Sequence, residues 1–378
     1  MSASLTTPQH ETIQLLAKAG TSVWLDDLSR AALDSGELSD LAERGLIAGV
    51  TTNPTIFHQA ITGSDSYAAQ LAALARLDVP PDAALRQLTC TDVRRAADVL
   101  RPLHGTEGNG MVSIEVSPHL AHDATRTLDE ARLLHWLVDR PNVMIKIPAT
   151  DAGLAAVTDA LAEGISVNVT LIFGLRRYRQ VMEAHLAGLE RAAAAGRDLA
   201  SIASVASFFV SRVDAAVDAR LPIGHPLRGQ AALANARLAY ELYEQTLDSA
   251  RWRALARRGA LPQRPLWAST GVKDPAYEDT RYVTGLVAPD TVNTMPRATL
   301  DAVLDHGEVH GDTVRTGYDE ARDVLRALAA DGIDLAAVAG ELETDGVARF
   351  QDSWQQLTRD IRVALSTTAP TGERPRSV

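Results

Sequence analysis

The segment Ser166-Val-Asn-Val-Thr-Leu171 has the alternation of a strand whose two faces differ in polarity. Successive side chains of a strand point to opposite faces, so Ser166, Asn168 and Thr170 share one face and three apolar residues share the other. A buried strand of an ordinary parallel sheet is apolar on both faces. In a barrel, the apolar face would contact the helices and the polar face the interior. The segment therefore favours a barrel.

A lysine lies in the middle of a second apolar run, Val143-Met-Ile-Lys-Ile147, which Pro148 closes. The run predicts a short buried strand, where an isolated ammonium is costly and tends to pair or lose its proton. A neutral amine in a dry pocket is a nucleophile toward carbonyls and can form a Schiff base. From position alone, a strand-end lysine that reaches solvent is the alternative.

Other predicted strands carry polar residues in comparable places. The same alternation pairs Lys146 with Met144 and Glu115 with Ser113. Several strands therefore send polar groups into one interior, as in the active sites of barrel enzymes. Local alternatives remain for single residues. Asp26 with its neighbour would be a helix N-cap pair, and Asn53 before a proline would be a turn start.

Strand-like segments followed by helical sequence predict a parallel sheet built from βαβ units. The predicted strands are Ser22–Asp26, Ala48–Asn53, Met111–Val116, Val143–Ile147, Ser166–Leu171, Ala203–Phe209, Pro265–Ser269 and Tyr282–Leu286. Eight strands close a (β/α)8 barrel. We predict an α/β fold, a (β/α)8 TIM barrel with additional helices, as one domain over residues 1–366.

The predicted barrel has helical additions. The gaps after the second and sixth strands each hold two or more helices, which could cover the mouth of the barrel. A helix over Pro8–Ala19 leads, and helices over Gly332–Ser366 trail. One face of the last helix is apolar, with Phe350, Trp354, Leu357, Ile361 and Leu365. The composition of residues 367–378 predicts a disordered tail.

Composition narrows the classes of partner and cofactor that are possible. The net charge of -11 argues against nucleic acid as a partner, although focused cations could still bind a small anion. Cys90 is the only cysteine, which excludes an intrachain disulfide and a thiolate metal cluster. His306 and His310 lack a third ligand nearby, so we predict no metal. No nucleotide-binding glycine motif, signal peptide or membrane span is evident, and we expect a cytoplasmic protein without a cofactor.

A phosphate site is predicted after the sixth and seventh strands. Arg212 follows the sixth, and Ser269-Thr-Gly-Val-Lys273 follows the seventh. Loops after the last strands of such barrels frequently bind phosphate, and a hydroxyl, a flexible backbone and two cations suit a phosphomonoester. In the alternative, Arg212 and Asp214 simply begin a solvated helix.

An ordered set of motifs resembles transaldolase over about residues 20 to 300. The motifs are Gly49-Val-Thr-Thr-Asn-Pro54, Val112-Ser-Ile-Glu115, Ile145-Lys-Ile-Pro-Ala-Thr150, Asn168-Val-Thr-Leu-Ile-Phe173 and Phe209-Val-Ser-Arg212. The resemblance implies a barrel of the pentose phosphate pathway that needs no metal or organic cofactor. It implies transfer of a dihydroxyacetone unit from sedoheptulose 7-phosphate or fructose 6-phosphate to glyceraldehyde 3-phosphate or erythrose 4-phosphate.

The resemblance also implies catalytic roles. Lys146 would form the Schiff base with the donor's C2 carbonyl, and Asp26 would be the acid/base at its C4 hydroxyl. Glu115, with Thr170, would position the water that transfers protons while the imine forms. The protonated imine would then stabilise the carbanion formed on cleavage.

Substrate-binding roles follow in the same way. Asn53 and Asn168 would bind the dihydroxyacetone hydroxyls with help from Ser207, and Arg212 and Ser269 would bind phosphate. Many members of the family have an arginine where this chain has Gly271. The nearest cation is Lys273, which we assign the second phosphate contact.

Two rival functions remain. One is a fructose-6-phosphate aldolase, which releases free dihydroxyacetone. Glu115 and Phe209 argue against it, because those aldolases usually have Gln and Tyr at these two positions. Phe209 is also one of the predicted substrate-binding residues. The other is a non-catalytic barrel that binds sugar phosphates. The sequence leaves open whether the protein is a monomer or a homodimer.

Overall fold

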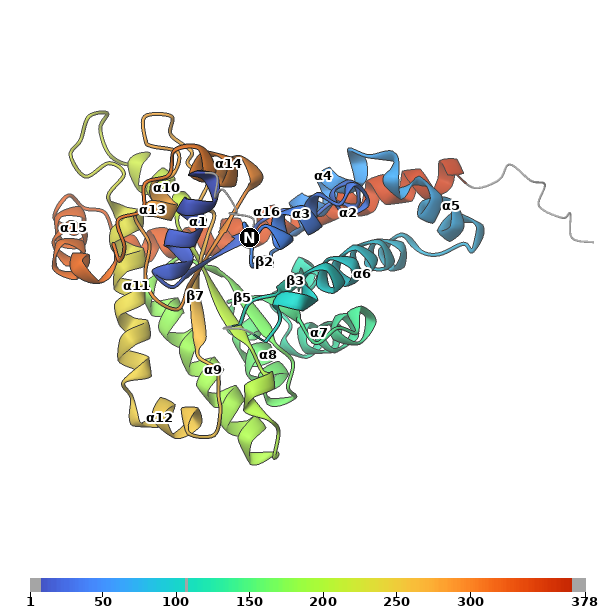
Figure 1. Cartoon of the computed structure of the whole chain (residues 1–378), viewed down its shortest axis with the longest axis horizontal. Helices are drawn as coiled ribbons and strands as arrows, with labels where there is room; N and C mark the ends of the chain where they lie inside the picture. The colour runs from blue at the N-terminus through green and yellow to red at the C-terminus, as the bar shows by residue number, and fades with distance from the viewer. Residues whose placement is uncertain (1–7, 106–107, 369–378) are drawn as a thin grey trace, which may run out of the picture.

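The computed structural model describes residues 8–105 and 108–368 and contains a closed barrel of eight parallel strands (Figure 1). The strands are β1 Thr21–Leu25, β2 Gly49–Val50, β3 Met111–Glu115, β4 Val143–Pro148, β5 Val167–Ile172, β6 Ser204–Phe209, β7 Gln263–Ala268 and β8 Thr291–Met295. Each strand pairs with the next in the sequence, and β8 pairs with β1. The prediction of a (β/α)8 barrel is confirmed.

Helices surround the barrel and fill both long gaps between strands. They are α1 Pro8–Lys18, α2 Arg30–Ser35, α3 Glu37–Glu43, α4 Pro54–Thr62, α5 Ala68–Arg76, α6 Pro81–Leu100, α7 Ala124–Val138, α8 Asp151–Ala162, α9 Leu175–Ala194, α10 Ser211–Asp218, α11 Ala231–Leu247, α12 Ala250–Ala256, α13 Arg281–Thr284, α14 Arg297–His306, α15 Tyr318–Ala330 and α16 Leu335–Thr368. Several begin at a side-chain cap, such as Thr150 for α8 and Asp123 for α7. As predicted, the gaps after β2 and β6 each contain more than one helix.

The predicted eighth strand, Tyr282–Leu286, is wrong. Its first residues lie in the short helix α13, and the eighth strand is Thr291–Met295. Aromatic and β-branched residues favour strands, but here Tyr282 and Val283 are simply buried helical residues. Pairing of β8 with both β1 and β7 selects the true strand. Those partners are distant in the sequence, so local composition did not reveal them.

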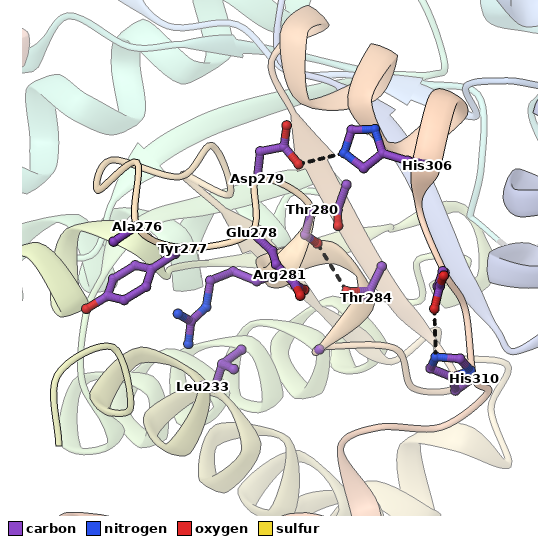
Figure 2. A pocket seen from close by; sticks show the side chains of 12 residues that line it. Leu233, Ala276, Tyr277, Glu278, Asp279, Thr280, Arg281, Thr284, His306 and His310 are labelled. Carbon is purple, nitrogen blue, oxygen red and sulfur yellow. Dashed lines mark hydrogen bonds and ion pairs between the residues drawn. The ribbon is translucent and has the colours of Figure 1, made fainter. Parts of the chain in front are cut away.

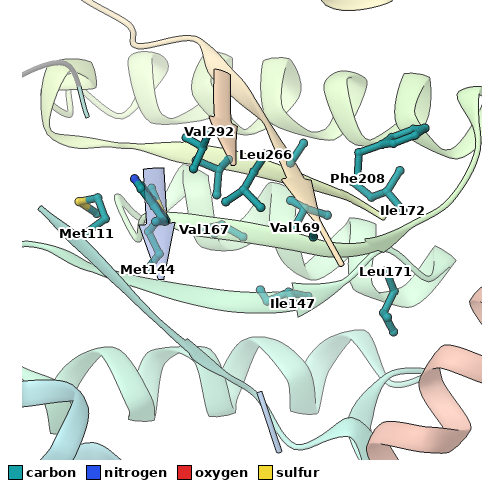
Figure 3. Packing of buried hydrophobic residues seen from close by; sticks show 14 of the residues in the cluster. Met111, Met144, Ile147, Val167, Val169, Leu171, Ile172, Phe208, Leu266 and Val292 are labelled. Carbon is teal, nitrogen blue, oxygen red and sulfur yellow. The ribbon is translucent and has the colours of Figure 1, made fainter. Parts of the chain in front are cut away.

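The barrel interior changes character along its axis. Below the polar mouth lies an apolar layer: Met144 and Val292 lie two residues before Lys146 and Thr294, and therefore on the same faces. Figure 3 shows these apolar side chains packed together with Leu266 of β7. Polar residues occupy the carboxyl-terminal ends. The polar residues predicted for the site on these strands therefore lie at one mouth of the barrel.

The alternation predicted for β5 holds except at its end. Val167 and Val169 are fully buried, and so are the polar Asn168 and Thr170 of the other face. The pairing with β6 shifts register between Val169 and Ile172, and Leu171 has a left-handed φ of 60°. A Cβ placed on Gly346 of α16 would lie 3.0 Å from the side chain of Leu171. Leu171 therefore meets the C-terminal helix.

That helix, α16, is a single helix of 34 residues. It packs against α4, α5, α6, α10 and β5, and Figure 1 shows it extending from the barrel alongside α4 and α5. Phe350, Leu357, Ile361 and Leu365 are buried, as the predicted apolar face requires. The helix continues to Thr368, two residues into the predicted tail, whose other residues lie outside the described range. No helix in the described ranges is long and apolar enough to cross a membrane.

Candidate active site

Three polar residues lie in register across three neighbouring strands at the mouth of the barrel. Glu115 of β3 is opposite Lys146 of β4, which is opposite Asn168 of β5. Their exposed fractions are 5%, 4% and 0% respectively. Strand pairing therefore holds a carboxylate, an amine and an amide side by side in a water-poor interior.

Lys146 does not reach solvent. Its Nζ donates a hydrogen bond to the Thr52 carbonyl oxygen at 3.1 Å and forms an ion pair with Glu115 Oε2 at 3.4 Å. The ring of Phe350, from α16, has its centroid 5.6 Å from Nζ. These three contacts fix the position of the amine at the barrel mouth, and the snorkelling alternative is wrong.

Glu115 is suited to proton transfer near neutral pH. Burial raises the pKa of its carboxyl to about 7, and the Asp26 charge adds to the effect, although the Lys146 ammonium opposes it. Among the described residues neither carboxylate oxygen accepts a hydrogen bond of good geometry. A carboxyl with such a pKa can both accept and return a proton at pH 7.

Two polar residues of β5, Asn168 and Thr170, face the same interior. Asn168 Nδ2 donates to Ser113 Oγ at 3.0 Å, and Asn168 Oδ1 accepts from Ser207 Oγ at 2.7 Å. These bonds hold the amide side chain in place between its two neighbours. Thr170 Oγ1 is buried and has no hydrogen-bond partner within the described ranges. An orphan hydroxyl of this kind is uncommon and is available to a water or a substrate.

Asp26 lies directly after β1 at the mouth of the barrel. Its Oδ1 accepts from Thr51 Oγ1 at 2.7 Å, and its backbone N–H donates to the Met295 carbonyl at 2.8 Å. The alternative of an N-cap is wrong, because Ser29 caps the following helix, α2. Asn53, in contrast, does cap α4 by accepting from the backbone N–H of Ile56 at 3.0 Å, and it also lines the cavity described below.

A cationic group lies at the start of α10. The Arg212 guanidinium stacks on Phe209, with Cζ 5.3 Å from the ring centroid, and Nη1 is buried without a hydrogen-bond partner among the described residues. Burial lowers the pKa of Arg212, and the neighbouring charge of Arg349 acts in the same direction. Asp214 does not begin a solvated helix: it is buried and accepts from the Tyr282 hydroxyl at 2.7 Å.

The loop after β7 adds a hydroxyl and a second cation. Ser269 has a left-handed φ of 56°, which is strained for a residue other than glycine, and its Oγ lies 3.0 Å from Ser211 Oγ. Strain of this kind is common at ligand sites. Lys273 lines the same cavity four residues later and forms no ion pair with another described residue.

One cavity of about 360 Å³ gathers most of these side chains. Eight of the predicted site residues line it: Asp26, Asn53, Lys146, Ser207, Phe209, Arg212, Ser269 and Lys273. Glu115, Asn168 and Thr170 are buried among the strand ends beside it. Glu115 also lines a cavity of about 20 Å³ that shares Asn53 with the large one.

The prediction missed other residues of the cavity wall. Thr51, Gln59, Thr294 and Phe350 also line it. Phe350 appeared in the sequence only as one member of an apolar helical face. No local signal could place it over a lysine more than 200 residues earlier, because helix packing decides that contact.

The two histidines considered for a metal lie elsewhere. They line an open groove of about 810 Å³, and none of the predicted site residues lines that groove (Figure 2). His306 pairs with Asp279 at 2.8 Å, and His310 with Glu308 at 3.7 Å. Within the described ranges, no cluster of three or more His, Cys, Asp or Glu residues could hold a metal ion.

Comparison with known proteins identifies relatives of the whole barrel. Residues 23–361 match the family described as Transaldolase/Fructose-6-phosphate aldolase. Transaldolase 1 of Streptomyces avermitilis is 56% identical over 370 residues, which cover 96% of this chain and 98% of that protein. The transaldolase of Thermobifida fusca is 58% identical over 361 residues, covering 94% of this chain and 98% of that protein.

Proposed function

The chain belongs to the transaldolase/fructose-6-phosphate aldolase family, and we propose that it works through a Schiff base on Lys146. It is an enzyme with transaldolase activity: it transfers a dihydroxyacetone unit from a ketose phosphate to an aldose phosphate. The observation that carries the proposal is the Lys146 amine, 4% exposed and 3.4 Å from Glu115, at a cavity that Arg212 and Lys273 also line. A sugar phosphate whose carbonyl lies near Lys146 would have its phosphate group within reach of these two cations.

Imine formation is the first step. The neutral Lys146 amine attacks C2 of the ketose, and loss of water from the carbinolamine gives the imine. Glu115, with a pKa of about 7, takes up the proton released by the attack and returns one to the departing hydroxyl. The free hydroxyl of Thr170 holds the water that relays these protons. Burial of the pair keeps bulk water from competing.

Cleavage of the C3–C4 bond follows. Asp26 accepts the proton of the C4 hydroxyl, the bond electrons move into the protonated imine, and the aldose phosphate departs. An enamine remains on Lys146, and the acceptor aldehyde then reverses the steps. The hydrogen bond from Thr51 at 2.7 Å holds the Asp26 carboxylate at the mouth of the cavity.

Binding groups orient the substrate for these steps. Ser113 and Ser207 fix the Asn168 amide, so it meets the dihydroxyacetone hydroxyls without reorganising. Asn53 faces the same cavity from the start of α4. At the other end, the phosphate is bound by the Ser269 hydroxyl, the Lys273 ammonium and Arg212 Nη1, which has no hydrogen-bond partner among the described residues.

Borohydride reduction in the presence of fructose 6-phosphate tests the nucleophile directly. The chain has three lysines, Lys18, Lys146 and Lys273, so peptide mass spectrometry assigns an adduct without ambiguity. We expect the reduced adduct on Lys146 alone. Lys18, exposed on α1, is the internal control. An unmodified Lys146 would contradict the proposal and favour a barrel that binds sugar phosphates without this chemistry.

A further inference from the structure

An aromatic ring from the C-terminal helix closes the active-site cavity above the lysine. Phe350 is 4% exposed, its ring centroid lies 5.6 Å from Lys146 Nζ, and it lines the same cavity as Asp26 and Arg212. The other lining residues come from the strands, the loops after them, α4 and, for Arg212, the start of α10. Phe350 alone comes from α16.

Specific contacts hold α16 in this position. Gly346, one turn before Phe350, permits close approach, since a Cβ there would lie 3.0 Å from Leu171 and 3.6 Å from Phe173. Polar contacts tie the same helix to the barrel on several sides: Arg177 with Glu343 at 3.0 Å, Thr55 with Ser353 at 2.9 Å, Gln351 with the Pro118 carbonyl at 3.2 Å, and His58 with Asp360 at 2.8 Å. These contacts therefore fix the position of the Phe350 ring over the Lys146 amine.

The enamine on Lys146 has two possible fates. In transfer, its carbon attacks the acceptor aldehyde. In hydrolysis, that carbon takes a proton, water adds to C2 of the resulting imine, and the C2–N bond breaks. Dihydroxyacetone then leaves and the lysine amine is regenerated. Both fates start from one intermediate and diverge when its carbon takes either a proton or the aldehyde, so the access of water to that carbon decides between them.

We propose that Phe350 makes transfer prevail, because its ring occupies the space from which water would deliver a proton to the enamine carbon. The inference rests on the proposed role of Lys146. A phenyl ring offers no hydrogen bond to a water, and replacing it by a methyl group would open room for several. The ring also faces the positively charged imine with its electron-rich surface, which favours formation of the intermediate.

The test measures the ratio of two rates with fructose 6-phosphate as donor: release of free dihydroxyacetone, and transfer to erythrose 4-phosphate. We expect Phe350→Ala to raise the ratio of release to transfer by about tenfold or more, by admitting water to the intermediate. Phe350→Leu, which keeps an apolar side chain over the enamine, should stay within about twofold of the unmodified enzyme. A merely structural role would lower both rates together and leave the ratio unchanged.

A second pair of variants moves the helix without changing the ring. Gly346→Val forces α16 away from Leu171 and should raise the ratio as well. Gly340→Val is the matched control, because a Cβ at Gly340 of the same helix meets no atom within 4 Å, and its ratio should not change. An unchanged ratio in a folded Phe350→Ala variant would overturn the inference, as would an equal rise in Phe350→Leu.

Borohydride trapping separates this inference from the proposed function. An adduct on Lys146 in Phe350→Ala, together with an unchanged ratio, would overturn only the role of Phe350. Absence of the adduct in the unmodified enzyme would overturn the proposed function itself. Circular dichroism of each variant identifies any that fails to fold, and in that case the Gly346 and Gly340 pair decides.

Discussion

Glu115 Oε2 and Lys146 Nζ lie 3.4 Å apart on neighbouring strands, and only 2% and 5% of their side chains are exposed. Burying such a pair is costly, and replacing it by apolar residues often stabilises a protein. Here the carboxylate oxygens have no hydrogen bonds from other described residues to offset that cost. A stability role therefore explains the pair poorly, whereas proton exchange between an amine and a carboxyl of pKa about 7 explains both residues.

Lys146→Ala should abolish the borohydride adduct and lower turnover by more than about 10³-fold, because the covalent intermediate is lost. The fold should persist, because removing the Lys146 charge, which lowers the pKa of Glu115, leaves a carboxyl that can be buried in its neutral form. Activity, trapping and a thermal melt at pH 6 check these points. Lys18→Ala is the control on an exposed lysine, and an adduct that appears on Lys273 in Lys146→Ala would reassign the nucleophile.

Glu115→Gln should slow imine formation by roughly 10²-fold, because an amide cannot accept a proton. The pH dependence should change as well. In the unmodified enzyme the single-turnover rate of imine formation should follow an ionisation near pH 7, and the variant should lose that step. Rapid-quench trapping from pH 5.5 to 8.5 measures both. Retention of the same pH step in Glu115→Gln would assign the ionisation to another group.

The same carboxyl should make stability depend on pH. Its pKa rises from 4.5 to about 7 on folding, so the folded protein binds the proton more tightly than the unfolded chain. The resulting stabilisation is present below pH 4.5 and is lost as pH rises through 7. Relative to Glu115→Gln, the unfolding free energy of the unmodified protein should fall by roughly 1–3 kcal/mol between pH 5 and pH 8. Urea unfolding at the two pH values measures this difference, and a rise would contradict it.

Thr170→Val should separate chemistry from stability. Its Oγ1 has no partner among the described residues, so the unfolding free energy should change by less than about 0.5 kcal/mol. Imine formation should slow by roughly tenfold, because the relay water loses its hydroxyl. Thr21→Val is the opposite control: its hydroxyl lies 2.9 Å from that of Thr291 at the other end of the barrel. That variant should lose stability and keep the imine rate.

Arg212→Ala and Lys273→Ala should both raise KM for fructose 6-phosphate with a smaller effect on kcat, since phosphate binding is uniform along the reaction. The effect of Arg212 should be the larger, roughly 10²-fold against about tenfold, because a guanidinium binds phosphate through two bonds and an ammonium as a point charge. Steady-state kinetics with fructose, which lacks the phosphate, provide the reference. Unchanged KM values in Lys273→Ala would place the second cation elsewhere.

Local sequence was enough to predict those elements whose pattern of polar and apolar residues is complete within one segment. Polar and apolar alternation in β5 indicated a barrel with a polar interior, and the apolar run around Lys146 indicated a buried amine. The pattern failed at Tyr282–Leu286, where strand-forming residues lie in a helix, because only pairing with β1 and β7 identifies β8. It also left open whether Asn53 only begins a turn or belongs to the site; Asn53 caps α4 and also lines the cavity.

The sequence by itself determined which polar residues share the interior faces of β3, β4 and β5, because strand periodicity and residue type are local properties. Only the tertiary structure decided how far apart they are. Strand register sets the 3.4 Å between Glu115 and Lys146, and the burial that results sets the pKa of Glu115. The packing of α16 places Phe350 over Lys146. Distances between segments remote in the chain depend on how the whole barrel closes, which no single segment encodes.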